Sequence, residues 1–161
     1  MFNPKTIIEC VGTFILVFTI QVAGSADLAP LGIGAILVAI VFMGGPISGG
    51  HYNPAVSLAV NLRGNMSLDE MMHYMVSQVL GGILGGLCGG IVSSSFSVAA
   101  MGKDVSNIQA FLAEVIFTFV LCLVVLLTAT NPKCEDNHYY GLAIGLVVCS
   151  GIISVGEFFV M

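Results

Sequence analysis

Apolar residues run through most of this chain in long stretches, with short polar segments between them. From Thr6 to Ser48 the only charged residues are Glu9 and Asp27, and a turn at 26–30 divides this region into two stretches of about 20 residues. The later apolar stretches cover residues 71–101, 109–130 and 138–161. About 20 apolar residues in a helix cross the hydrocarbon core of a bilayer, so the pattern predicts five membrane-spanning helices.

One polar segment interrupts this pattern, PISGGHYNPAVS at residues 46–57. Asn53 is a preferred helix N-cap and Pro54 suits the first helical position, so a short helix is predicted over 53–62. That helix would cross only about half of the bilayer. Residues 49–52 before it would be extended backbone, which survives at membrane depth only where protein buries it or a watery cavity solvates it. The segment therefore indicates a pore, with an ordinary capped surface loop as the alternative.

Composition supports a membrane protein and excludes several other classes. The chain is 57% hydrophobic and 8% charged, with a mean hydropathy of +1.04, far from a soluble domain. Four Lys and Arg residues in total leave no basic patch for nucleic acid. The first apolar stretch is too long for a signal peptide and contains an acid, Glu9. A multi-pass integral membrane protein follows, embedded in a lipid bilayer.

The residues offer no chemistry of an enzyme or a metal site. Five cysteines lack metal-type spacing and are interpreted as packing residues. No Ser-His-Asp arrangement or phosphate loop is present in the sequence. We therefore expect no catalytic residue, no metal and no cofactor.

The cations suggest an orientation. If the amino terminus is cytoplasmic and the spans alternate, Lys5, Arg63 and Lys133 lie inside and Lys103 lies outside. That distribution agrees with the excess of Lys and Arg in cytoplasmic loops.

The chain also contains a weak internal repeat. Glu9, Thr13 and Phe14 reappear as Glu114, Thr118 and Phe119, and LGIG at 31–34 is similar to LAIG at 142–145. Three spans in the first half would invert the second half, as in many transport proteins. We expect a single membrane domain, 1–161, with a first repeat over 6–104 and an incomplete second repeat over 105–161.

SGGHYNPAVS resembles the first Asn-Pro-Ala box of the aquaporin, or major intrinsic protein, family. The Glu9 and Glu114 segments, Gln78 and GLAIGL at 141–146 also follow the order and spacing of that family. The resemblance implies an all-α, aquaporin-like inverted-repeat bundle with five spans and one re-entrant half-helix. It also implies a homotetramer.

The resemblance further implies roles for individual residues. Asn53, Pro54 and Ala55 would form the pore motif, with Asn53 as the donor to a passing molecule. The carbonyl groups of the preceding residues would be the acceptor track, although the His51 side chain could instead brace the loop: Gly49, Gly50, His51 and Tyr52. Glu9, Gln78 and Glu114 would be buried braces of loop backbone, with the membrane interface as the alternative for both acids. Ile33 and Ile152 would be constriction residues.

One part of the family pattern has no counterpart here. At the repeat offset, the residue matching Asn53 would fall beyond Met161. We expect a truncated or incompletely described member of the family, which could be inactive alone.

The sequence therefore predicts a passive channel for water and small uncharged solutes. Two alternatives remain open: a secondary transporter with inverted repeats, and a non-conducting membrane subunit that modulates full-length aquaporins.

Overall fold

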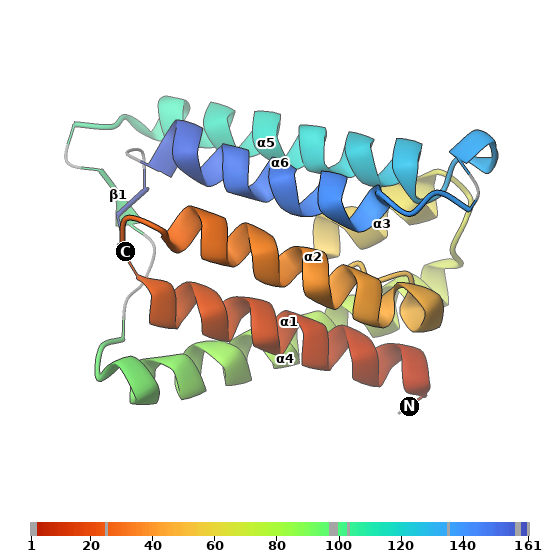
Figure 1. The fold of residues 1–161 in the computed structure, drawn as a ribbon, viewed down its shortest axis with the longest axis horizontal. Helices are drawn as coiled ribbons and strands as arrows, with labels where there is room; N and C mark the ends of the chain where they lie inside the picture. The colour runs from red at the N-terminus through yellow and green to blue at the C-terminus, as the bar shows by residue number, and fades with distance from the viewer. Residues whose placement is uncertain are drawn as a thin grey trace.

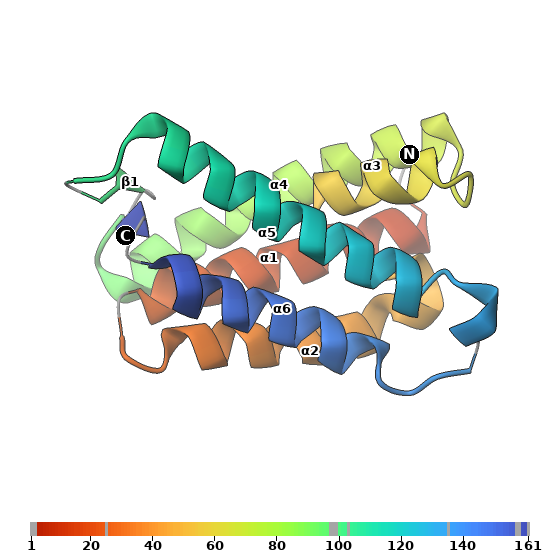
Figure 2. The same cartoon turned by 90° about the horizontal axis from the view of Figure 1, so that it is seen from above.

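The computed structural model describes residues 3–24, 26–96, 100–102, 104–134, 136–156 and 159–160. Its helices run nearly along one common axis (Figures 1 and 2). In chain order they are α1 (Pro4–Ala23), α2 (Ala29–Ser48), α3 (Pro54–Leu62), α4 (Leu68–Ser93), α5 (Asn107–Thr128), the 3₁₀ turn η1 (Pro132–Cys134) and α6 (Tyr140–Val155).

Within the described ranges, α1, α2, α4 and α5 are long and apolar enough to cross a membrane. The fifth predicted span corresponds to α6, an apolar helix of 16 residues. The predicted short helix is α3, nine residues long, with Asn53 as its N-cap. The hydrophobic pattern thus located the long helices, and the Asn53-Pro54 cap located α3.

A two-residue strand pair was not predicted. Strand β1 (Ala100–Met101) pairs antiparallel with β2 (Phe159–Val160), with Ala100 opposite Val160 and Met101 opposite Phe159. Two residues are too few to give a readable alternating pattern, so the sequence carries no signal for this pairing.

Helix α1 packs against α4 and α2, while α6 packs against α2 and α5. The α1–α4 contact is close because glycines of α4 face the α1 backbone: a Cβ at Gly85 would lie 2.5 Å from the Phe14 carbonyl oxygen, and one at Gly81 would overlap the Cys10 carbonyl oxygen. Lys5 of α1 also binds Glu70 of α4, with 2.7 Å between Nζ and Oε1. Small residues on one face of α4 thus let the two helix backbones approach closely.

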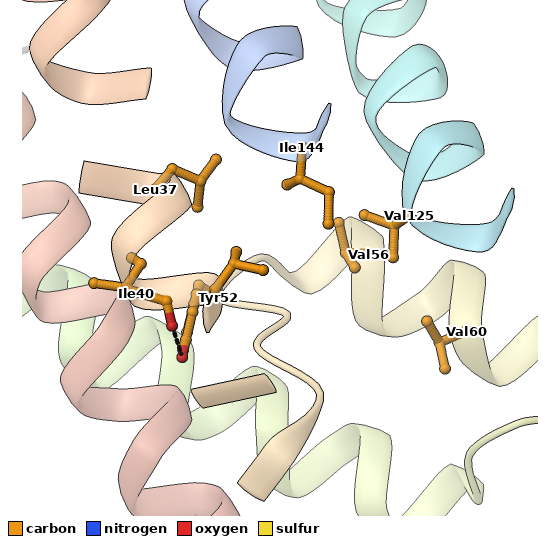
Figure 3. Packing of buried hydrophobic residues seen from close by; sticks show 8 residues of the cluster. Leu37, Ile40, Tyr52, Val56, Val60, Val125 and Ile144 are labelled. Carbon is orange, nitrogen blue, oxygen red and sulfur yellow. Dashed lines mark hydrogen bonds between the residues drawn. The ribbon is translucent and has the colours of Figure 1, made fainter. Parts of the chain in front are cut away.

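The apolar core lies where α3 meets α2, α5 and α6 (Figure 3). Its members come from four helices and the loop before α3: Leu37, Ile40, Val41, Tyr52, Val56, Val60, Val125 and Ile144. This cluster holds the amino end of α3 inside the bundle.

Candidate functional site

The segment between α2 and α3 turns back along α2. Tyr52 donates its hydroxyl to the carbonyl of Ile40, which lies eight residues before the end of α2 at Ser48. At 1.5 Å per helical residue the loop retraces about 12 Å toward the middle of the bundle. Helix α3 then returns to the end at which α2 finished and α4 begins (Figure 1). Chain entry and exit thus lie on the same side, as the sequence predicted.

Left-handed backbone makes this reversal possible. Gly49 has φ 91°, Gly50 has φ 64° and Tyr52 has φ 47°. Glycine adopts such values without a steric penalty, whereas a tyrosine there is uncommon and must be held by its surroundings. The loop conformation therefore depends on specific contacts of Tyr52.

Each backbone N–H from 49 to 52 points into the protein. The N–H of Gly49 donates to the Gly45 carbonyl at 3.0 Å, and that of Gly50 donates to Ser48 Oγ at 3.1 Å. His51 N lies 3.0 Å from Glu9 Oε1, and Tyr52 N lies 2.7 Å from Glu9 Oε2. The donors of this loop are therefore all used.

Glu9 is the centre of this network. Its side chain is fully buried, at 0% exposure, and it also accepts hydrogen bonds from Ser48 Oγ at 2.6 Å and Gln78 Nε2 at 2.8 Å. A carboxylate inside a bundle is costly unless donors surround it. Four donors to two oxygens satisfy that requirement and attach the loop to α1.

Gln78 connects Glu9 to α3. Its Nε2 also donates to Ser57 Oγ at 2.9 Å, and Ser57 Oγ lies 3.1 Å from His51 Nδ1. Since Glu9 accepts, the amide nitrogen must face it, which leaves Gln78 Oε1 buried with no partner in the part of the chain described. The His51 ring also meets Tyr74 edge-on, with 5.3 Å between ring centroids. The His51 side chain therefore has the contacts of a loop brace.

The carbonyl groups contrast with the N–H groups. Among the residues that the structure describes, none donates a hydrogen bond to the carbonyl oxygens of residues 49–52. Backbone carbonyls at membrane depth need a partner or water. These four oxygens therefore have no hydrogen-bond donor among the described residues.

Asn53 uses only half of its side-chain amide. Its Oδ1 accepts from Ala55 N at 2.8 Å and so caps α3, with Pro54 in the first helical turn. No described residue accepts a hydrogen bond from the Asn53 Nδ2 group. A helix amino end carries a partial positive charge, so a free amide donor here would favour an electron-rich atom and disfavour a cation.

A separate cavity of about 630 Å³ lies between α1, α2, α5 and α6, and it brings Ile33, Ile152 and Glu114 together. Its wall is mainly apolar, with Asp27 and Thr118 among the exceptions. The residues that line this cavity do not include Asn53 or the 49–52 loop. The structure therefore divides the predicted site residues into two groups. One contains Asn53 and the 49–52 loop with Glu9 and Gln78, and the other contains Ile33, Ile152 and Glu114 around the cavity.

Glu114 differs from its expected role as a buried brace. Its side chain is exposed, and it forms no hydrogen bond with the described residues. Glu9 is buried because the 49–52 loop folds over it, whereas no such loop covers Glu114 within the described ranges. Repeated sequence around the two acids does not give them equal surroundings.

Three members of the network were not singled out from the sequence: Ser48, Ser57 and Tyr74. Tyr74 is fully buried and donates its hydroxyl to the Ser48 carbonyl at 2.7 Å. One signal could have found it, since Tyr74 and Gln78 are four residues apart and share a face of α4. Ser57 is likewise four residues after Asn53, and its hydroxyl donates to the Asn53 carbonyl at 3.3 Å.

Metal chemistry finds no support in the described part of the chain. No group of three or more His, Cys, Asp or Glu side chains in those ranges could hold a metal ion. The five cysteines are free thiols, spread over different helices and η1.

Several spanning helices and one short helix, α3, whose connecting loop turns back into the bundle, define a polytopic membrane protein with a re-entrant segment. The chain belongs to the major intrinsic protein family, whose model matches residues 2–159. It is thus a membrane protein of a channel family rather than an enzyme.

Similar proteins agree with this assignment. The chain is 33% identical to Aquaporin TIP1-2 of Musa acuminata, over 97% of this chain and 71% of that protein. It is 31% identical to a probable aquaporin of TIP type from Antirrhinum majus, over 86% of this chain and 59% of that protein. The X-ray structure of the aquaglyceroporin from Plasmodium falciparum superposes with a TM-score of 0.81 at 25% identity, over 97% of this chain and 74% of that one. The chain thus spans between about three fifths and three quarters of these proteins.

Proposed function

We propose that this protein is a passive membrane channel for water and small uncharged solutes. The observation that carries the proposal is the polarity of the loop at 49–52, whose N–H groups are all bonded within the protein while no described residue donates a hydrogen bond to its four carbonyls. A file of open carbonyls can accept hydrogen bonds from water or from hydroxyl groups in place of bulk solvent.

Asn53 supplies the complementary donor at the end of this file. Because its Oδ1 caps α3, its amide hydrogens are the groups left for a passing oxygen atom. The positive end of α3 beside it raises the energy of a cation at this point. The proposal therefore includes exclusion of cations, with Pro54 and Ala55 placing the helix end.

The second part of the pathway is the cavity that Ile33 and Ile152 line. Neither side chain offers a hydrogen bond, so a strongly hydrated ion would lose solvation there without compensation. Small neutral molecules lose less, which supports the proposed solute class.

The test is osmotic flux in proteoliposomes that contain the whole chain. Stopped-flow light scattering is expected to show faster shrinkage than in protein-free liposomes, with a low activation energy. Flux that depends on a proton or sodium gradient would point to a secondary transporter. Shrinkage equal to that of empty liposomes would contradict a channel formed by this chain and favour a non-conducting subunit.

Asn53→Asp sharpens this test, because Asp keeps the cap acceptor for Ala55 N and removes the amide donor. We expect α3 to persist by circular dichroism, while the cation leak measured with a potential-sensitive dye rises above that of the unsubstituted chain. Asn53→Ala removes both groups and is expected to lower folded yield as well. An unchanged leak in Asn53→Asp would contradict the role given to the amide.

We also propose a homotetramer with a cytoplasmic amino terminus. Lys5, Arg63 and Lys133 lie at one end of the bundle, which supports that orientation; Lys103 lies outside the described residues. Light scattering of the detergent complex, corrected for bound detergent, tests the subunit number, and a monomer would contradict it.

A further inference from the structure

We propose that Tyr52 is a positioning residue, whose ring occupies a slot formed by Gly12 of α1 and Gly44 of α2 and thereby sets how deeply the loop carries Asn53 into the bundle. Its effect on permeation rests on the proposed function, but the slot itself does not.

The slot exists only because both glycines lack a Cβ. A Cβ placed on Gly12 would overlap the edge of the Tyr52 ring and lie 2.5 Å from its Cζ. One placed on Gly44 would overlap the Tyr52 hydroxyl oxygen, and it would lie 3.1 Å from Cζ and 2.6 Å from the Cγ2 methyl of Ile8. The ring is 2% exposed, so both walls close on it.

Tyr52 is also held at both of its ends. Its hydroxyl donates to the Ile40 carbonyl at 2.8 Å, as Figure 3 shows, while its backbone N–H donates to Glu9 Oε2 at 2.7 Å. One end fixes the residue to α2 and the other to α1. The length of the Tyr52 side chain therefore sets how far the loop backbone lies from the Ile40 carbonyl.

This attachment explains the unusual backbone of Tyr52. A non-glycine residue at φ 47° costs free energy and persists only where surrounding contacts compensate. Asn53, the next residue, is extended at φ −152° and ψ 125°, with its side chain on the end of α3. A change in the depth of Tyr52 is transmitted to Asn53 through one peptide unit.

Other glycines of the same bundle provide the contrast. A Cβ on Gly32, also in α2, would meet no atom within 4 Å. Gly32→Ala is therefore a matched control for Gly44→Ala, with the same chemical change on the same helix and no slot to fill.

The experiment measures backbone hydrogen exchange of residues 49–55 by mass spectrometry on the whole chain in detergent. Gly12→Ala and Gly44→Ala are each expected to speed exchange about tenfold or more, as overpacking of a core site would. Gly32→Ala is expected to leave the rate within about twofold of the unsubstituted chain.

The decisive result compares each glycine substitution in two backgrounds, because Tyr52→Phe and Tyr52→Leu also remove the hydrogen bond to Ile40 and speed exchange by themselves. Tyr52→Phe removes the hydroxyl oxygen that a Cβ on Gly44 would overlap, so Gly44→Ala should raise the exchange rate by a smaller factor in a Tyr52→Phe chain than in the unsubstituted chain; the Ile8 methyl 2.6 Å from that Cβ keeps part of the effect. Gly12→Ala, which ring carbons obstruct, should raise the rate by a smaller factor in a Tyr52→Leu chain but not in a Tyr52→Phe chain. If both glycine substitutions raise the rate by the same factor in every background, or if Gly12→Ala behaves like Gly32→Ala, the slot is refuted.

A permeation arm separates positioning from simple packing. In proteoliposomes, Gly12→Ala should change the ratio of glycerol to water permeability, and adding Tyr52→Leu should move that ratio again. If both permeabilities fall in equal proportion per folded chain, Tyr52 only packs and the positioning role is refuted. If the unsubstituted chain conducts nothing, the proposed function fails while the exchange pattern still decides the slot.

Discussion

At the scale of single residues, the attachment of the loop to the bundle depends on the Glu9 carboxylate. Two of its partners are backbone N–H groups of His51 and Tyr52, and two are side chains, Ser48 and Gln78. Three of these donors are buried and the His51 N–H is partly buried, so each one left without an acceptor costs free energy through its desolvation. The loop is consequently sensitive to a change that removes a single acceptor atom.

Glu9→Gln tests this dependence. The substitution replaces one acceptor oxygen with a donor NH₂ group, which must face at least one of the existing donors. We expect the free energy of unfolding, measured by SDS titration in mixed micelles, to fall by about 2–4 kcal/mol.

Glu114→Gln is the matched control, since its carboxylate forms no hydrogen bond within the described ranges. Its unfolding free energy is expected to change by less than about 0.5 kcal/mol. Equal losses in the two variants would show that the Glu9 hydrogen bonds contribute nothing specific.

At the scale of elements, α1 and α4 are in contact through backbone rather than through interlocked side chains. Gly81, Gly85 and Gly89 of α4 face α1, and a Cβ on Gly89 would lie 2.7 Å from Gln21 Cβ. Gly82 and Gly86 each follow one of these glycines by one residue, and they face side chains of α1 rather than its backbone. This close approach brings Gln78 within reach of Glu9.

Alanine substitutions at the α4 glycines should therefore have two different effects on stability, depending on whether the glycine faces the α1 backbone. Gly81→Ala and Gly85→Ala would push against α1 carbonyl oxygens, and each is expected to lower the unfolding free energy by about 1–3 kcal/mol. The same SDS titration measures the loss.

In Gly82→Ala and Gly86→Ala the added Cβ would lie 3.7 Å and 3.9 Å from Val17 methyl groups, which is ordinary contact. We expect those two variants to be unchanged or more stable by up to about 1 kcal/mol, because alanine favours helix over glycine. Losses of the same size in both registers would contradict the proposed helix contact.

At the scale of the whole molecule, the described Lys and Arg residues lie at one end of the bundle. Lys5, Arg63 and Lys133 lie at the end where α1 begins and α5 finishes, while Asp104 lies just before α5 begins. Positive residues near the ends of spans are retained on the cytoplasmic side. This distribution supports the proposed orientation, in which the end that contains Lys5 is cytoplasmic.

Thiol labelling tests this orientation. Cys134 of η1 is half-buried and follows α5, so with the other four cysteines replaced it should react with a membrane-impermeant maleimide in inverted vesicles but not in intact cells. A second chain lacking native cysteines and carrying Asp104→Cys, at the opposite end of α5, should give the reverse result. If the Cys134 chain is instead labelled in intact cells and the Asp104→Cys chain in inverted vesicles, the proposed orientation is wrong.

Much of the fold can be predicted from short-range sequence signals. Stretches of about 20 apolar residues locate α1, α2, α4 and α5, and Asn53-Pro54 locates the start of α3, because hydropathy and capping depend on neighbours in the chain. The acids Glu9 and Glu114 carry the same local signal, and only one of them is buried. Local sequence cannot tell them apart, since burial depends on which loop folds over each acid.

The sequence by itself determined the spans, the interrupted helix and the presence of costly polar residues within apolar segments. Only the tertiary structure decided that Glu9 meets donors 39, 42, 43 and 69 residues away. It also decided that Gly12 and Gly44 leave room for one aromatic ring. The physical reason is that hydropathy and capping are properties of adjacent residues, whereas hydrogen-bond partners and steric gaps are defined by distances between segments that come together only when the chain is folded.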